Sequence, residues 1–328
     1  MTLTHEKIGS IQKNFDSIRN ELSRVVVGHE VILKHLFICL LSGGHALIEG
    51  VPGLGKTLIV KSLTRILDLK YSRIQFTPDL MPADIVGTNI VKEDQTGGRY
   101  FEFYKGPIFG QLILADEINR ASPKTQSALL EAMQEEKVTV FGKEYPLEPP
   151  FMVIATQNPI EMEGTYPLPE AQIDRFFFKL KIDYPDRDGL HKIIDKTTRD
   201  DPPDLERLLG APSILEMKSL IRKVPIASHV KDYAIRLVLA SHRQHPSATE
   251  LIKQYVLYGA SPRGVMALVM AGKVSALLAG RYNVAVEDIR AVAKPALRHR
   301  LVMNIKGETE GIDTDDLIDG LLKSVGDE

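Results

Sequence analysis

Eight residues near position 50 have the types and spacing that wrap a phosphate chain. They read Gly50-Val51-Pro52-Gly53-Leu54-Gly55-Lys56-Thr57, a full match to G-x-x-x-x-G-K-[ST]. Glycines allow backbone conformations that aim several N–H groups at a phosphate, beside the start of a helix. The lysine of such a loop reaches the β- and γ-phosphates, and the threonine hydroxyl ligates Mg²⁺. The run predicts a site for a nucleoside triphosphate with Mg²⁺, and a glycine-rich turn without a ligand is the alternative.

Two carboxylates follow an apolar run farther along the chain. The sequence Leu112-Ile-Leu-Ala-Asp116-Glu117 reads as a buried strand that ends in acids, where the edge of a sheet would face the phosphates. Asp116 is predicted to hold Mg²⁺ through water, and Glu117 to accept a proton from the attacking water. With both roles the site would hydrolyse the nucleotide. The alternative is that either acid caps the next helix.

A polar residue ends another apolar run, Phe151-Met-Val-Ile-Ala-Thr-Gln-Asn158. If this run is a neighbouring strand, the amide of Asn158 lies at the same edge of the sheet and can orient the water or the γ-phosphate. An asparagine before Pro159 is also a common turn residue. The local sequence leaves both interpretations open.

These side chains need a buried parallel sheet to bring them together. Short apolar runs at residues 46–49, 72–76, 111–115, 151–156 and 176–182 alternate with helical segments such as 56–67 and 123–135. Strands that are apolar on both faces and alternate with helices are typical of a parallel sheet covered on both sides. We therefore expect an α/β domain, interrupted by a β-hairpin at about residues 85–104 and a smaller one at 137–147.

The remaining segments are mainly helical. A leading helix carries an apolar stripe from Ile8 to Val25, which predicts packing on its own domain, with a self-associating coiled coil as the alternative. After about residue 183 the strand signals fade, and helices are predicted at 214–222, 228–243, 262–280, 287–300 and about 315–322. We expect a first domain over residues 1–183 and a helical domain over 184–328.

Composition excludes several classes of protein. The chain has 41 Lys and Arg against 43 Asp and Glu, a formal net charge of −2, which argues against a protein that holds nucleic acid by charge. The single cysteine, Cys39, excludes an internal disulfide and a multi-cysteine zinc site. The chain shows neither a signal-peptide core nor an apolar run long enough to cross a bilayer, so we expect a cytoplasmic protein without membrane insertion.

Several motifs together resemble the MoxR family of AAA+ ATPases. They are the run from Gly50 to Thr57, Phe76-Thr-Pro-Asp-Leu-Met-Pro-Ala-Asp84, Ala115-Asp-Glu-Ile-Asn-Arg-Ala121, Ala155-Thr-Gln-Asn-Pro159 and Glu163-Gly-Thr-Tyr-Pro-Leu-Pro-Glu-Ala-Gln-Ile-Asp-Arg-Phe176. The resemblance covers about half of the chain. It implies a P-loop NTPase of AAA+ type, with an αβα core around a parallel sheet and a C-terminal all-α lid.

The resemblance also assigns roles to individual residues. Asn158 falls on the sensor 1 position, Arg175 on the arginine finger that a neighbouring subunit supplies, and Arg263 on sensor 2 in the lid. Val27 and Gly28 fall where the family contacts adenine. The implied ATP contacts are Val27, Gly28, the run from Gly50 to Thr57, Leu58, Asp116 and Arg263. Lys56, Arg175 and Arg263 are thus expected to converge on one triphosphate. Arg120 is a second candidate for an interface contact.

The residues around Arg263 give an independent argument. In Gly259-Ala-Ser261-Pro262-Arg263-Gly264, Ser261 is a predicted N-cap and Pro262 the first helical residue, which puts Arg263 in the first turn. The helix dipole disfavours a cation there by about 0.3–1 kcal/mol. A nearby phosphate would offset that cost, and a local carboxylate is the alternative. The basic cluster Arg298-His299-Arg300 is interpreted as a solvated helix face.

The resemblance implies a ring of subunits, typically a hexamer, and client proteins with von Willebrand factor A domains. The leading hypothesis is an ATPase that remodels, assembles or activates client complexes, with insertion of metal cofactors as one such role. Alternatives are a nucleotide-gated binding protein that hydrolyses slowly and a DNA-processing AAA+ protein. The resemblance also places the hairpin at about residues 85–104 where the family carries an insert that projects toward the ring pore or the substrate. A purely structural hairpin remains open.

Overall fold

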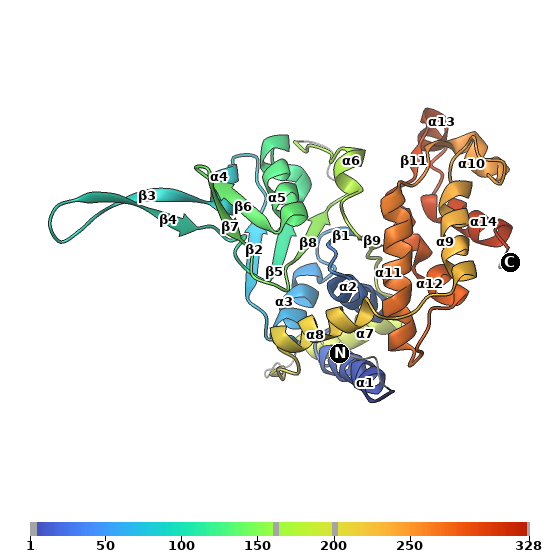
Figure 1. Cartoon of the computed structure of the whole chain (residues 1–328), viewed down its shortest axis with the longest axis horizontal. Helices are drawn as coiled ribbons and strands as arrows, with labels where there is room; N and C mark the ends of the chain where they lie inside the picture. Colours follow the sequence, from blue (N-terminus) through green and yellow to red (C-terminus); the bar gives the residue numbers. More distant parts are fainter. Residues whose placement is uncertain (1–4, 160–163, 199–202, 327–328) are drawn as a thin grey trace.

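The structure is a computed structural model that describes residues 5–159, 164–198 and 203–326. Residues 1–4 and Glu163, which opens the last motif quoted above, lie outside the described residues. Figure 1 shows a central sheet with helices, a long hairpin that projects from it, and a group of helices on the opposite side.

Five parallel strands form the central sheet, in the order β2-β5-β8-β1-β9. They are β1 (Ala46–Glu49), β2 (Tyr71–Gln75), β5 (Leu112–Asp116), β8 (Met152–Gln157) and β9 (Phe178–Lys181). Each lies within two residues of its predicted run. Because the strands are parallel, they all end at one side of the sheet, which we call the carboxyl edge, and begin at the other, the amino edge.

Strands β1, β5 and β8 are buried on both faces, as their continuous apolar runs predicted, whereas the edge strand β2 buries only Ile74. Successive strand residues point to opposite faces, so Ala46 and Ile48 belong to one core cluster and Leu47 to another. The first cluster includes residues of α1 (His5–Ser23), α2 (Glu30–Ser42) and α3 (Lys56–Ile66), and the second those of α4 (Pro82–Val86) and α5 (Pro123–Glu135). This confirms the layered α/β fold.

The apolar stripe of α1 packs within the chain. Ile8, Ile11, Phe15, Ile18 and Leu22 are all buried in the first core cluster. The stripe is therefore buried within the chain, which leaves no apolar seam on this helix for a coiled coil. It packs against α3 of its own predicted domain and also against residues 262–278 of the predicted helical domain.

The chain after β9 is helical, as expected. Its helices are α7 (Arg187–Thr197), α8 (Ala211–Ile221), α9 (Ser228–Ala240), α10 (Glu250–Tyr255), α11 (Pro262–Leu278), α12 (Val286–Leu297), α13 (Ile305–Thr309) and α14 (Thr314–Ser324). The sequence missed α7, α10, α13 and the short antiparallel pair of β10 (Val256–Tyr258) and β11 (Val302–Met303). Among the described helices, none has both the length and the apolar character of a membrane span.

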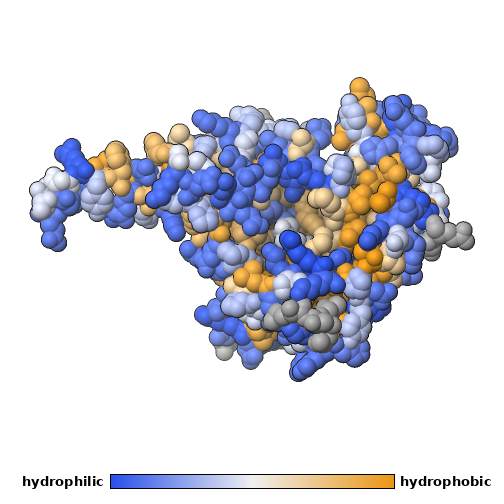
Figure 2. Space-filling model, viewed as in Figure 1, coloured by the Kyte–Doolittle hydropathy of each residue, from blue (hydrophilic) through white to orange (hydrophobic). Residues whose placement is uncertain are grey.

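Two hairpins leave the sheet domain near the predicted positions. The longer joins β3 (Gly87–Glu93) to β4 (Arg99–Lys105) and projects into solvent (Figure 1). Its outer part is mainly hydrophilic with one apolar group (Figure 2), and Val91 and Phe101 are exposed. The shorter joins β6 (Lys137–Val140) to β7 (Lys143–Pro146) through Phe141 and Gly142. Phe103 of the longer hairpin stacks on Tyr145 of the shorter, so the two are packed together at their bases.

The basic cluster after α12 is not a solvated helix face. His299 and Arg300 are buried, and the side chain of Arg298 is only 11% exposed. Arg298 forms a two-pronged pair with Asp315, with Nε to Oδ1 and Nη2 to Oδ2 both at 2.9 Å. The interpretation was wrong because Arg298 pairs with Asp315, 17 positions further on, and Arg300 with Asp174, 126 positions earlier, which no local pattern could reveal.

Candidate active site

The predicted phosphate loop connects β1 to α3 at the carboxyl edge. Gly53 and Gly55 have φ of +86° and +76°, in the left-handed region that favours glycine. At Gly50, a Cβ atom would lie 2.9 Å from the carbonyl oxygen of Ile182, so only glycine fits without a shift. The Lys56 Nζ donates to the Gly50 carbonyl at 2.6 Å, which holds the ammonium over the loop. The backbone thus has the open, inward-facing shape that a phosphate requires.

The two predicted acids lie at the same edge, held by a threonine of the next strand. Thr156 is fully buried, and its hydroxyl donates to Asp116 Oδ1 at 2.6 Å and accepts from the backbone N–H of Glu117 at 2.9 Å. Arg73 also donates to Asp116, with Nη2 2.7 Å from Oδ2. The carboxylate of Asp116 is therefore fixed from two sides while the residue stays 8% exposed.

Glu117 sits in a sharp turn that lifts it away from β5. Its φ and ψ are 58° and 48°, a left-handed conformation that is uncommon for a non-glycine residue. Its Oε2 accepts from Gln75 Nε2 at 2.9 Å and from Arg120 Nη1 at 3.0 Å. Both donors bind Oε2, so they orient the carboxylate while its other oxygen, Oε1, can still accept a proton from water.

Asn158 follows β8 and is buried at the same edge. Strand β8 lies between β1 and β5, and the Gly50 N–H donates to the carbonyl of Gln157 at 3.3 Å. This register puts the phosphate loop, Asn158 and the two acids side by side, although they are up to about a hundred positions apart in sequence. The sequence missed Arg73, Gln75 and Thr156, because their partners are on other strands.

A cavity of about 320 Å³ opens beside the phosphate loop. Of the predicted ATP contacts it is lined by Val27, Gly53, Leu54, Gly55 and Leu58. The far wall comes from Tyr184, Pro185, Leu190, Ile193 and other residues of α7 and the segment before it, which the sequence did not predict. Gly28 does not line this cavity, but with φ of +77° it turns the chain between Val27 and His29, which do.

The surroundings of this cavity fit the adenine end of ATP. Its walls are mostly aliphatic, as in many ligand pockets, and burial lowers the pKa of His29, so the neutral ring is favoured. For Mg²⁺, the Thr57 hydroxyl and the Asp116 carboxylate are oxygen donors of the kind that the ion prefers. Elsewhere in the described ranges no cluster of three or more His, Cys, Asp or Glu side chains is suited to a metal ion.

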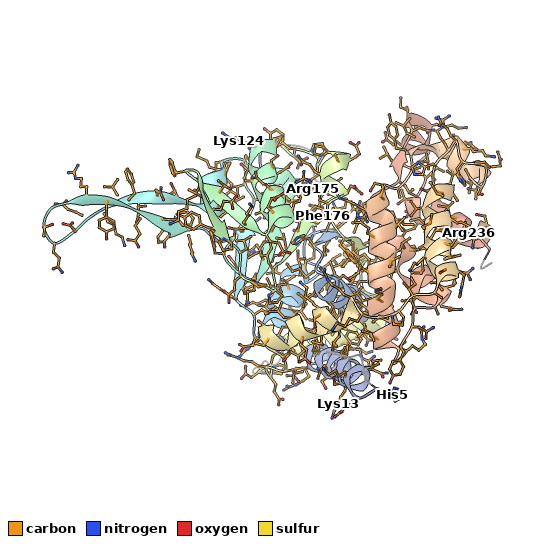
Figure 3. All side chains as sticks on the ribbon, viewed as in Figure 1. His5, Lys13, Lys124, Arg175, Phe176 and Arg236 are labelled. Carbon is orange, nitrogen blue, oxygen red and sulfur yellow. The ribbon has the colours of Figure 1, made fainter. Side chains whose placement is uncertain are left out.

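Arg175 lies at the amino edge, across the sheet from the phosphate loop. The Phe177 N–H donates to the carbonyl of His45 at 2.8 Å, and Phe178 pairs with Ala46, the first residue of β1. The segment before β9 is thus at the beginning of β1, whereas the phosphate loop is at its end. Figure 3 places Arg175 and Phe176 between the sheet domain and α11.

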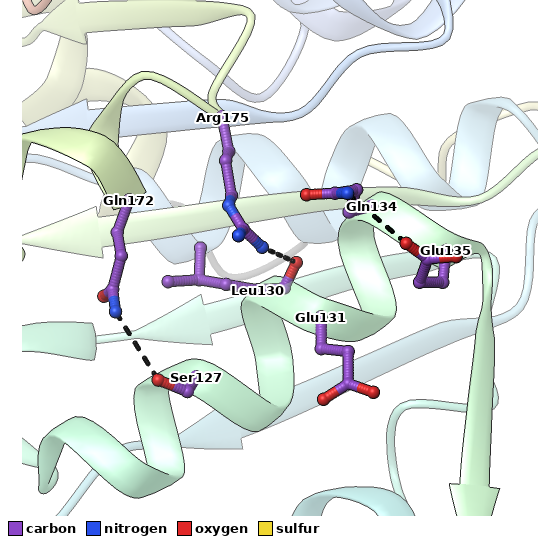
Figure 4. Close-up of a pocket in the computed structure, with 7 residues that line it drawn as sticks. All are labelled: Ser127, Leu130, Glu131, Gln134, Glu135, Gln172 and Arg175. Carbon is purple, nitrogen blue, oxygen red and sulfur yellow. Dashed lines mark hydrogen bonds between the residues drawn. The ribbon is translucent and has the colours of Figure 1, made fainter.

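The side chain of Arg175 is exposed and points toward α5. It lines a cavity of about 260 Å³ with residues of α5 and with Gln172, which belongs to α6 (Glu170–Ile173) (Figure 4). Its Nη1 donates to the carbonyl of Leu130 at 3.3 Å, a single weak contact. Glu131 and Glu135 line the same cavity. A cation held this loosely can turn toward an anion on another molecule.

Arg263 lies beside Arg175 and not beside the phosphate loop. Ser261 caps α11 as predicted, and its Oγ accepts from the N–H of Arg263 at 3.2 Å. The anion near Arg263 is the carboxylate of Asp174, with Nη1 3.3 Å from Oδ2, which is the local alternative that the sequence left open. Arg175 and Arg263 line one cavity of about 310 Å³, which we call the amino-edge cavity.

The four predicted catalytic residues and the predicted nucleotide contacts Lys56 and Asp116 therefore form two groups in one chain. Lys56, Asp116, Glu117 and Asn158 gather at the carboxyl edge, and Arg175 and Arg263 at the amino edge. We expected Lys56, Arg175 and Arg263 to converge on one triphosphate, with Arg175 supplied by a second subunit. In this conformation Arg263 does not reach the Lys56 of its own copy, because it lies with Arg175 at the amino edge.

Comparison with known families covers both parts of the chain. Residues 45–178 match the model of the ATPase family associated with various cellular activities (AAA), and residues 248–321 match that of the AAA lid domain. The chain is 40% identical over 305 residues to Chaperone MoxR1 of Mycobacterium tuberculosis, covering 93% of this chain and 80% of that protein.

Two further proteins are also similar to this chain over most of its length. The chain is 32% identical to Protein MoxR of Methylorubrum extorquens, with 86% of each chain covered. A crystal structure of a protein from Cytophaga hutchinsonii superposes with a TM-score of 0.91 at 42% identity, covering 98% of this chain and 97% of the other. The similarity thus extends over nearly the full length, in sequence and in three dimensions.

Proposed function

The chain belongs to the MoxR family of AAA+ ATPases, and from this premise we propose that it hydrolyses ATP between neighbouring copies to drive chaperone-like remodelling of client proteins. The family makes it an ATPase. The finer roles below are part of the proposal. They concern the residues of each edge, the association of copies and the clients.

At the carboxyl edge, the phosphate loop binds ATP and Glu117 acts on water. The loop N–H groups and Lys56 bind the β- and γ-phosphates. Thr57 and Asp116 hold Mg²⁺, which when bound supplies neutralisation of phosphate charge. Glu117 accepts the proton of the attacking water, which Asn158 orients. Each of these side chains is already at one sheet edge, so binding needs only local turns.

At the amino edge, Arg175 and Arg263 act on the ATP of a neighbouring copy. The observation that carries this proposal is their position across the sheet from the chain's own phosphate loop. An arginine at the γ-phosphate stabilises the charge that develops during transfer. Because the donor face and the acceptor site lie on different sides of the chain, the contact is head-to-tail, and repetition of such a contact forms a ring when the rotation between copies closes. We propose a hexamer.

The clients in this proposal are proteins with von Willebrand factor A domains. The helical region, residues 184–328, moves against the sheet domain, residues 1–183, as ATP is hydrolysed. We propose that these two parts meet at residues 183 and 184, between β9 and α7. One relative is named a chaperone, which supports remodelling as the use of the ATPase, and insertion of metal cofactors is one form of it. The β3–β4 hairpin, with exposed Val91 and Phe101, is proposed to contact the client or the ring pore.

Dependence on protein concentration tests the shared site. The ATPase rate per chain should rise as copies associate, in step with the size measured by light scattering. A chain that hydrolyses ATP at its full rate as a monomer would refute the shared site. A rate that stays negligible in the ring and with clients would favour the nucleotide-gated binding protein. A strong, salt-dependent affinity for DNA would favour the DNA-processing protein.

A further inference from the structure

A buried network joins the segment that carries Arg175 to the helical region. At its centre is the carboxylate of Asp174, the residue before Arg175. Asp174 accepts from the hydroxyl of Ser261, at 2.9 and 3.0 Å from its two oxygens, and from Arg300 Nε at 3.0 Å. The contact with Arg263 Nη1 at 3.3 Å completes the set. Three residues of the helical region thus bind one carboxylate of the sheet domain.

The guanidinium of Arg300 also holds the main chain of the same segment. Its Nη2 donates to the carbonyls of Phe176 at 2.7 Å and Asp174 at 3.2 Å, and its Nη1 donates to that of Phe177 at 3.2 Å and to that of Ala296. His299 adds a bond from its ring Nε2 to the Phe176 carbonyl at 2.9 Å. Three of the four peptide carbonyls from residue 174 to 177 are therefore bound from the helical region.

This arrangement uses every donor that an arginine has. A guanidinium carries five N–H groups, and the five acceptors named above match them. Its side chain is only 2% exposed. Burial lowers the pKa of Arg300 to about 10, and the paired Asp174 opposes that shift, so the group stays charged at neutral pH. A buried ion pair can often be replaced by apolar residues without loss of stability, so packing alone does not explain a cation here.

Arg175 and Arg263 are the exposed ends of this network. Arg175 directly follows Asp174, and Arg263 is paired with it; both side chains reach the amino-edge cavity. The apolar surface of α11 that borders the cavity is visible in Figure 2. The two exposed arginines therefore share one buried support. Their spacing and orientation depend on Asp174 and Arg300.

We propose that Asp174 and Arg300 are positioning residues that lock Arg175 and Arg263 into one unit with the helical region, so that both arginines reach the neighbouring copy's ATP together. The inference rests on the proposed function of the two arginines. In a ring, a movement of the helical region in one copy would then carry its arginines toward or away from the next copy's ATP. The network is thus a route by which the copies could coordinate their ATPase cycles.

Asp174→Asn tests this with little change in volume, and Arg300→Met is the second variant, in case one of the two fails to fold. We expect either variant to lower kcat by about 10²-fold, the order of loss that a misplaced catalytic group causes. The affinity of the variant's own phosphate loop for a fluorescent ATP analogue should be unchanged. Asp315→Asn is the matched control, since it breaks the nearby pair with Arg298 but touches neither Arg175 nor Arg263. Its kcat should stay at the wild-type value.

Mixed rings separate positioning from general damage. Lys56→Ala chains cannot use ATP but carry intact arginines, so they should restore hydrolysis at the phosphate loops of Asp174→Asn neighbours. At a 1:1 ratio about one interface in four has the productive arrangement, which sets the expected recovery at about a quarter of the wild-type rate.

Two outcomes would overturn the inference. One is a kcat of Asp174→Asn and Arg300→Met equal to that of the control. The other is that Lys56→Ala chains restore hydrolysis in mixed rings with Arg175→Ala chains but not in mixed rings with Asp174→Asn or Arg300→Met chains. If Arg175→Ala itself is not restored, the shared active site is wrong, and the positioning role falls with it.

Discussion

The two edges of the sheet hold their functional side chains in different ways. At the carboxyl edge each one comes from the end of a strand, from the loop that follows it or from the first turn of the next helix, and neighbouring strands hold these segments side by side. At the amino edge Arg175 is exposed, and its support comes from residues 87 to 126 positions away from Asp174. The first edge is preformed within a sheet. The second depends on how the helical region sits against the sheet, so it is the edge that a conformational change can move.

The largest loss of kcat should come from a substitution at the amino edge. Arg175→Ala should lower kcat by about 10³-fold or more, since arginine fingers contribute about 10³–10⁵ to phosphoryl transfer. ATP affinity should change little, because Arg175 is across the sheet from its own phosphate loop. Phosphate release and the binding of a fluorescent ATP analogue measure the two quantities. Arg19→Ala, on the exposed side of α1, is the control and should leave both unchanged. A large loss of ATP affinity in Arg175→Ala would remove the functional distinction between the edges.

Glu117→Gln tests the carboxyl edge by itself. The amide cannot accept the proton of water, so kcat should fall by about 10²–10⁴-fold, the range for general acid–base catalysis. ATP should still bind. Glu144→Gln, which breaks an exposed pair with Lys137 at the β6–β7 hairpin, should hydrolyse at the wild-type rate. If Glu117→Gln turns over ATP normally, the proton acceptor is another group.

The sequence was informative about the carboxyl edge for a physical reason. A phosphate loop needs particular residues at consecutive positions. A buried parallel strand is a continuous apolar run. Both the elements and their ends could therefore be predicted. The same reasoning failed for Arg300, whose partners Asp174 and Phe176 are brought to it only by the tertiary fold. It also failed for α7: Tyr184 and Leu190 line the cavity beside the phosphate loop, but Pro185 and Gly189, residues typical of turns and loops, stand at the start of that short amphipathic helix and hide it.

Acid should lower the free energy of unfolding through a buried histidine at the amino edge. His45 accepts from the Val153 N–H through Nδ1 at 3.0 Å, so its Nε2–H donates to the Met133 carbonyl at 2.9 Å and the ring is neutral. Burial lowers its pKa from 6.5 to about 4. Between these values the unfolded chain binds the proton and the folded chain does not, so stability is complete above pH 6.5 and falls as the pH falls toward 4. The loss from this group is about 3 kcal/mol.

Urea unfolding at pH 7 and pH 4 measures that loss. In His45→Gln, which keeps a donor and an acceptor but cannot be protonated, the difference between the two pH values should shrink by about 3 kcal/mol. His191→Gln, on the exposed side of α7, should show the wild-type difference. An equal pH dependence in His45→Gln and the wild type would mean that acid acts elsewhere, for example on His35, whose pKa is also lowered to about 4 by burial.

The smallest effect concerns backbone strain, which both regions contain. Near the carboxyl edge the non-glycine residue with positive φ is Glu117, which has a proposed chemical role. The β6–β7 hairpin follows α5 in the chain. Its non-glycine residue with positive φ is Phe141, with φ of +50° and a side chain 82% exposed. A residue with a Cβ is disfavoured in this region by about 1–2 kcal/mol, and Asn tolerates it better. Phe141→Asn should therefore raise the free energy of unfolding by about 0.5 kcal/mol.

Phe141→Ser provides the control for that prediction, because it removes the same ring but is not favoured at positive φ. Urea unfolding should rank Asn above Ser, and basal ATPase should be unchanged in both, since the hairpin is outside the proposed catalytic groups. Equal stability of the two variants would show that Phe141 carries no strain. If Asn is the more stable residue, then Phe141 is retained at a cost in stability, as residues at functional surfaces often are. The hairpin beside the movable edge, and not only the longer β3–β4 hairpin, would then be a surface on which to test client binding.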